Sequence, residues 1–154
     1  MRPGQSMMRV KTLARLAVVS VCLAILSCAN EEKFAVLDSE PVTLLADDRT
    51  IFINYWAVWC GPCIEEMPVL AEFREQNSDK VEVYGVNFDN PTPEQLRSDI
   101  EKLNVQIPNL LEDPAPAFGV ITPQILPSTL VVRKGKLIDV LIGLQTLESL
   151  AAAL

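Results

Sequence analysis

Two cysteines separated by two residues, Cys60 and Cys63, are the side chains best suited to chemistry in this sequence. At this spacing both thiols fall on one helical turn. A cysteine at the first turn of a helix lies near unpaired N–H groups and the positive end of the helix dipole, which favours the thiolate. We therefore expect Cys60 to be the nucleophile and Cys63, more buried, to be the resolving thiol. Gly61 lets a substrate backbone approach, and Pro62 stiffens the turn.

A pair of this kind is also half of a common zinc site, which is the main competing interpretation. The chain has four cysteines and no histidine, and the other two, Cys22 and Cys28, fall in a leader described below. No third or fourth zinc ligand remains, so we expect no metal. A bridge across two residues closes almost no loop and adds little stability. The pair is therefore predicted to serve redox chemistry.

Composition removes other classes of function. Without histidine, Ser-His-Asp and Cys-His catalysis are excluded. The formal net charge of −7 argues against nucleic acid, which is bound by Lys and Arg. A length of 154 residues fits one domain.

The first 27 residues have the layout of a secretory signal. Basic residues from Arg2 to Arg15 precede an uncharged apolar run, Leu16 to Leu26, and all acidic residues lie beyond position 30. At about 1.5 Å per residue this run is too short to cross a hydrocarbon core of roughly 30 Å. We expect residues 1–27 to be a targeting signal rather than part of the folded domain.

The end of this run resembles the bacterial lipobox. Ile25, Leu26 and Ser27 precede Cys28, although Leu26 is bulkier than the residue usually found there. The resemblance implies cleavage before Cys28 and a lipid-modified N-terminus that holds the protein on a membrane. Residues 28–33 would then be the lipidated cysteine and a short tether. The alternative is an ordinary cleaved signal and a soluble periplasmic protein.

Hydrophobic patterning predicts the elements that position the cysteines. The run from Thr50 to Ala57 is almost wholly apolar, as in a central strand buried on both faces, and a helix containing Pro68, which should kink it, follows Cys60. A second strand spans Val81 to Phe88. Thr92, Pro93 and Gln95 then form a capping box for a helix that completes a βαβ unit.

The remaining residues complete a mixed α/β sheet with helices on both faces. Residues 106–127 are rich in proline and irregular. The expected elements are short edge strands at 34–37 and 42–45, a short strand at 107–111, a helical turn at 115–118, strands at 129–132 and 137–142 joined as a hairpin, and a last helix capped by Thr146. We expect one domain, 34–154.

The segment NYWAVWCGPCIEEMP resembles the active site of thioredoxin-fold proteins, and in detail the TlpA-like branch of extracytoplasmic thiol-disulfide oxidoreductases. WCGPC is highly specific, and the trailing EMP indicates the branch. The resemblance covers about 34–154. It implies the thioredoxin fold, one redox-active dithiol, protein disulfides as substrates and no cofactor.

The resemblance also assigns an acid. The family's buried carboxyl, three residues after the second cysteine, falls on Glu66, which becomes the candidate base for Cys63. Cytosolic thioredoxins instead have an aspartate six residues before the first cysteine, where this chain has Asn54. The alternative is an exposed helix carboxylate like Glu65.

A proline completes the implied site. The fold places a cis-proline against the dithiol, and Pro127 fits this position, with the backbone of Leu126 pairing with an extended substrate. The alternative is a trans-proline opening a strand. Trp59 is expected to flank the site and contact substrate, whereas Trp56 is expected to pack in the core.

Together these features predict a membrane-tethered reductase on the periplasmic side. It would reduce disulfides of secreted proteins, among them apocytochrome c, and would itself be reduced by a membrane thiol-disulfide electron donor. We expect a monomer. A disulfide-forming oxidase and a non-catalytic binding or metal-carrier lipoprotein stay open as alternatives. A peroxidase is less favoured, because Thr122 and Pro123 precede no cysteine.

Overall fold

The computed structural model of the protein describes residues 32–154. The predicted leader (1–27), Cys28 and the tether up to residue 31 lie outside this range. Within it, no helix has both the length and the apolar character needed to cross a membrane.

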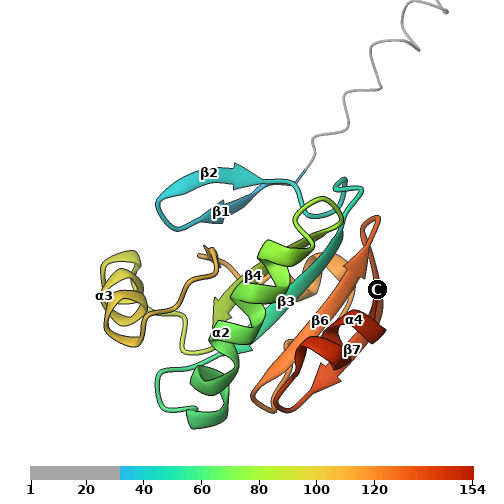
Figure 1. Cartoon of the computed structure of the whole chain (residues 1–154). Helices are drawn as coiled ribbons and strands as arrows, with labels where there is room; N and C mark the ends of the chain where they lie inside the picture. Colours follow the sequence, from blue (N-terminus) through green and yellow to red (C-terminus); the bar gives the residue numbers. More distant parts are fainter. Residues whose placement is uncertain (1–31) are drawn as a thin grey trace, which may run out of the picture. The chain divides into compact units, whose positions relative to one another are not determined.

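The described residues fold around one seven-stranded sheet in the order β2-β1-β5-β4-β3-β6-β7 (Figure 1). Its strands are β1 (Phe34–Val36), β2 (Ser39–Val42), β3 (Thr50–Trp56), β4 (Val81–Asn87), β5 (Asn109–Leu110), β6 (Ser128–Arg133) and β7 (Lys136–Ile142). β3, β4 and β5 run parallel, whereas β6 is antiparallel to β3 and β7 to β6. The mixed sheet and its short N-terminal edge strands confirm the prediction.

β3 lies at the centre and carries the chain to the cysteines. All seven of its residues are buried, in agreement with the apolar run from which the strand was predicted. It pairs with β4 on one side and β6 on the other, and both pairings continue to its last residues. Its carboxyl end, next to the dithiol, is therefore held from both sides.

Between and after these strands, residues 32–154 form the helices α2 (Gly61–Gln76), α3 (Pro93–Leu103), the 3-10 helix η1 (Ala115–Phe118) and α4 (Leu147–Ala152). α2 continues through Pro68 as one helix. Thr92 begins α3 by accepting a hydrogen bond from the Gln95 N–H at 3.3 Å. The Gln95 side chain bonds to Asp99 instead of returning to Thr92, so the predicted capping box is only half formed.

Two apolar cores lie on the two faces of the sheet. On one face, Phe52 and Trp56 of β3 pack with Met67 and Phe73 of α2 and with Leu150 of α4. Figure 1 shows α2 and α4 lying over this face. On the other face, β3 side chains pack with β1 and with η1. Successive side chains of a strand point to opposite faces, so β3 contributes to both cores.

One predicted edge strand is displaced. The return strand begins at Ser39 and ends at Val42, and residues 43–45 are not strand. Asp38, with φ 55°, makes a tight turn directly after β1, so the chain reverses earlier than its apolar residues suggest. The β6–β7 hairpin follows the prediction, with Lys134 and Gly135 at positive φ.

Candidate active site

The two cysteines form a disulfide at the start of α2, with Cα atoms 5.3 Å apart. Cys60 is the N-cap of the helix, and its sulfur accepts a hydrogen bond from the Cys63 N–H at 3.3 Å. Cys60 is 6% exposed and Cys63 is fully buried. This is the order of accessibility predicted from the sequence. A sulfur in the N-cap position is where the helix terminus most favours a negative charge.

Exposed residues surround Cys60. Gly61 and Pro62 are exposed, and Trp59 has 64% of its surface open. The Trp59 indole N–H donates to Asp89 at 2.9 Å, and its ring meets Phe88 edge to face, 6.5 Å between centroids. Trp59 is therefore a fixed, exposed aromatic surface next to the disulfide.

Trp56 has the opposite environment. It is fully buried, as the sequence predicts, and its indole N–H donates to Oδ1 of Asn109 at 2.8 Å. This bond passes beside Gly85, where an added Cβ would lie 2.5 Å from Asn109 Oδ1. The sequence gives no signal for Asn109, because the partners are 53 residues apart.

Pro127 lies at the same edge of the sheet as the dithiol. The Leu126–Pro127 peptide bond is cis, the isomer that the resemblance implies, so the trans alternative is wrong. Ser128, the next residue, pairs with Tyr55 near the carboxyl end of β3. The Pro127 carbonyl accepts from the Gly143 N–H at 2.9 Å.

Glu66 is fully buried, whereas Glu65 is exposed, so the alternative of an exposed Glu66 carboxylate is wrong. One oxygen, Oε1, accepts from the amide nitrogen of Asn54 at 2.7 Å. The other, Oε2, accepts from the backbone N–H of Gln145 at 2.8 Å. Burial raises the pKa of Glu66, and the bonds from Gln145 and Asn54 oppose this effect by stabilising the carboxylate.

Asn54 links Glu66 to β6. Besides Glu66, its amide nitrogen donates to the hydroxyl of Thr129 at 3.0 Å. Its amide oxygen, Oδ1, is buried and has no hydrogen-bond partner among the described residues. The sequence marks Asn54 as the one amide side chain of a largely apolar strand, but contains no sign of Thr129 or Gln145 in this cluster.

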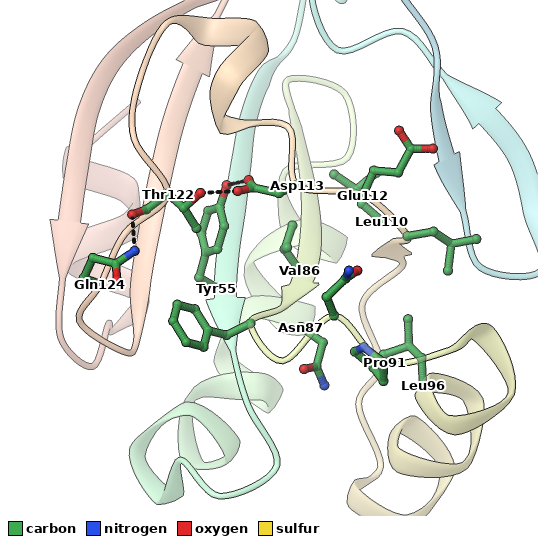
Figure 2. Close-up of a pocket in the computed structure, with 13 residues that line it drawn as sticks. Tyr55, Val86, Asn87, Pro91, Leu96, Leu110, Glu112, Asp113, Thr122 and Gln124 are labelled. Atoms are coloured by element: carbon green, nitrogen blue, oxygen red, sulfur yellow. Dashed lines mark hydrogen bonds between the residues drawn. The ribbon is translucent and has the colours of Figure 1, made fainter.

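A cavity of about 600 Å³ lies beside the site, at the carboxyl ends of β3 and β4. Figure 2 shows Tyr55 and Thr122 both pointing at Asp113, whose carboxylate accepts from the Tyr55 hydroxyl at 2.5 Å and from the Thr122 hydroxyl. Phe88, which contacts Trp59, also lines the cavity. None of the site residues predicted from the sequence lines it.

This geometry suits thiol-disulfide exchange. A disulfide at a helix N-terminus has one sulfur near the surface and one inside, and exchange requires a thiolate to attack a disulfide sulfur through a mixed disulfide. A buried carboxyl one helical turn after Cys63 has a pKa moved toward neutrality, in the direction that suits a proton acceptor.

Comparisons with known proteins agree with this chemistry. The Redoxin family matches residues 28–150. The chain is 32% identical over 107 residues to a thioredoxin of Alicyclobacillus acidocaldarius, covering 70% of this chain and 80% of that protein. It is 28% identical over 122 residues to the thiol-disulfide oxidoreductase ResA of Bacillus cereus, covering 76% of this chain and 70% of ResA.

Solved structures show the same fold. StoA of Bacillus subtilis superposes with a TM-score of 0.66 at 20% identity, covering 79% of this chain and 94% of StoA. A DsbF homologue of Corynebacterium diphtheriae also has a TM-score of 0.66, at 24% identity, covering 80% of this chain and 82% of that one.

Proposed function

The chain belongs to the Redoxin family and has the thioredoxin fold, and from this premise we propose that it works as an extracytoplasmic, membrane-tethered reductase of protein disulfides. That it is a TlpA-like thiol-disulfide oxidoreductase follows from the family and its relatives. The observation that carries the proposal is the dithiol itself, with Cys60 at the N-cap of α2 and Cys63 buried behind it.

The catalytic steps follow from the positions of the two sulfurs. In the reduced protein, the Cys60 thiolate attacks a target disulfide, and the target's first sulfur leaves as a thiolate. The resulting mixed disulfide joins Cys60 to the target. Cys63 then loses its proton, attacks the Cys60 sulfur and releases the target's second thiolate. The target gains two electrons, and the protein is left with the Cys60–Cys63 disulfide.

Other residues have supporting roles in this proposal. Glu66 accepts the Cys63 proton, because it is buried one helical turn away with a raised pKa. Trp59, Gly61 and Pro62 form the exposed surface against which a target rests. The backbone of Leu126, before the cis-proline, pairs with the extended target segment.

The reducing direction is supported by the residues between the cysteines. Gly61 and Pro62 match the reducing thioredoxins, whose reduction potential is about −270 mV, whereas the oxidant DsbA has about −120 mV. A reductase outside the cytoplasm needs a supply of electrons, so a membrane thiol-disulfide donor belongs to the proposal. Apocytochrome c is a candidate target that rests on the resemblance alone.

The location rests on the leader. A basic, then apolar segment that ends at Cys28 fits export and lipid attachment on the periplasmic side. Mass spectrometry of the N-terminal peptide tests this directly. The expected peptide begins at lipidated Cys28, and Cys28→Ser should move the protein from the membrane to the soluble fraction. An unmodified N-terminus would overturn the anchor.

The function is tested by insulin reduction together with the reduction potential of the dithiol, measured in glutathione buffers. We expect insulin to be reduced and a potential close to that of reducing thioredoxins. Cys60→Ser should abolish the reaction, and Cys28→Ser should leave it unchanged. A potential near that of DsbA would establish the oxidase instead, and zinc bound by the reduced protein without turnover would establish a carrier.

A further inference from the structure

Asn54 is the one amide side chain of β3, and only its nitrogen atom has hydrogen-bond partners among the described residues. Its nitrogen donates to Glu66 Oε1 at 2.7 Å and to the Thr129 hydroxyl at 3.0 Å, while its oxygen has no partner within residues 32–154. Buried polar atoms in folded proteins are nearly always paired, so an unpaired amide oxygen beside a buried acid needs an explanation.

Glu66 receives a hydrogen bond at each oxygen. Asn54 donates to Oε1 and the Gln145 N–H donates to Oε2, an arrangement that suits the ionised carboxylate. These two donors come from β3 and from the loop before α4, and neither of them is charged. On its own helix the other buried group that can titrate, once the disulfide is reduced, is Cys63, one turn earlier, whereas the neighbouring Glu65 is exposed. If Glu66 is protonated, its new O–H group faces a hydrogen-bond donor and has no acceptor in this arrangement.

A half-turn of the Asn54 amide removes this conflict. Rotation exchanges the two amide atoms, so Oδ1 would take the place that is 2.7 Å from Glu66 Oε1 and 3.0 Å from Thr129 Oγ1. Oδ1 could then accept from the protonated carboxyl and from the Thr129 hydroxyl, because a hydroxyl both donates and accepts. In either orientation one of the two amide atoms has no hydrogen-bond partner, so rotation does not change the number of unpaired buried atoms.

We propose that Asn54 is a positioning residue whose side-chain amide has two orientations, one that donates to ionised Glu66 and one that accepts from protonated Glu66. This inference rests on the proposed function, in which Glu66 takes the Cys63 proton. In that step the Cys63 S–H bond breaks, an O–H bond forms on Glu66, and the sulfur keeps the electron pair with which it attacks Cys60. The Asn54 amide rotates when Glu66 gains or loses the proton, so Glu66 keeps a hydrogen bond to Asn54 in both charge states.

The wild-type protein allows a direct test by NMR, with no variant that could fail to fold. The pH titration of the Glu66 side-chain carboxyl carbon and the Asn54 side-chain NH2 resonances are followed in the same samples. We expect the Asn54 resonances to shift with the midpoint of Glu66. If they stay constant through the Glu66 titration, the amide does not follow the proton and the proposal is overturned.

Asn54→Leu supplies a second test, because leucine has a similar volume and neither donates nor accepts. The substitution removes a partner from both charge states of Glu66, but the charge-assisted bond to the carboxylate is the stronger of the two, so the Glu66 pKa should still rise. Cys60 is first joined to 5-thio-2-nitrobenzoate, and release of the coloured thiolate by Cys63 is timed against pH. The midpoint of this profile should rise with the Glu66 pKa. A variant that folds with an unchanged midpoint contradicts the proposal.

Glu65→Gln, at an exposed neighbour on the same helix, is the matched control and should leave the midpoint in place. The outcome is separable from the proposed function, since the NMR titration needs no substrate. A protein that fails to reduce insulin but whose Asn54 follows Glu66 would reject the reductase and keep the amide rotation.

Discussion

The backbone N–H of Gln145 donates to Oε2 of Glu66 at 2.8 Å, a contact that joins the loop before α4 to α2 across 79 residues of sequence. Both residues are buried, so the bond lies where water does not compete for it. Closure of the C-terminal segment thus completes the environment of the acid.

Replacing Glu66 by glutamine should change how stability depends on pH. The folded-state pKa of Glu66 is raised by burial, so the folded protein binds a proton more tightly than the unfolded chain does. The stabilisation by the protonated acid is complete below the unfolded-state pKa and is lost as pH rises through the folded-state pKa. Glu66→Gln should therefore become more stable relative to wild type as pH rises.

Urea denaturation of the disulfide form at several pH values measures this difference. The altered hydrogen bonds should change the free energy of unfolding by the same amount at every pH. Only a change of the difference between the two proteins with pH reports the titration of Glu66. Parallel stability curves from pH 4 to pH 8 would show that the Glu66 pKa does not differ between the folded and unfolded states. Glu65→Gln is the control for losing a charge on α2.

Gly85→Ala should destabilise the fold by about 1–3 kcal/mol, the usual cost of overfilling a packed site. The new Cβ would lie 2.5 Å from Oδ1 of Asn109 and 3.0 Å from Nε1 of Trp56, so the bond between these two side chains must shift. Thermal or urea unfolding measures the loss. Gly61→Ala, where nothing lies within 4 Å of the added Cβ, should lose no stability. Equal effects at both glycines would contradict the packing argument.

The pair Tyr55 and Asp113 should show a coupling energy of about 1.5–3 kcal/mol, typical of a hydrogen bond to a charged group. The Tyr55 hydroxyl donates to the Asp113 carboxylate at 2.5 Å, and burial together with this bond raises the tyrosine pKa. A double-mutant cycle with Tyr55→Phe and Asp113→Ala measures the coupling by urea unfolding. Additive effects would mean that the bond contributes nothing.

Cys63→Ala should trap targets on the protein. Without the resolving thiol, the mixed disulfide at Cys60 has no internal route to release. Non-reducing gels should show covalent adducts that disappear with reductant. Cys60→Ala, the matched variant, should form few or none, because Cys63 is fully buried. Equal trapping by both variants would mean that the buried sulfur also meets targets and that the assigned order is wrong.

Sequence patterns predicted the elements whose hydrophobic period is unambiguous. The apolar run of β3 and the WCGPC segment located the central strand, the start of α2 and the fold. The second edge strand, expected at 42–45, was placed too late, because the positive φ of Asp38 that turns the chain early is not visible in apolar spacing.

The sequence did not predict the hydrogen-bond partners of the buried polar groups. Asn54 was recognisable as an exception in its strand, but Thr129 and Gln145 reach it and Glu66 only through the register of β6 and the closure of α4. Such contacts depend on tertiary packing, which local patterns do not encode.

The outermost strand, β7, pairs with β6 on one side, and no other strand of the described chain borders it. It carries Ile138, Val140 and Ile142, all exposed. Rows of unpaired backbone groups with apolar neighbours are templates for fibre-like stacking of separate molecules. Lys134 and Lys136, both exposed at the hairpin where this strand begins, are the kind of charged side chain that keeps natural edge strands from pairing with a second molecule. Replacing these two lysines by uncharged residues should therefore make the protein aggregate more readily in solution while leaving its chemistry intact.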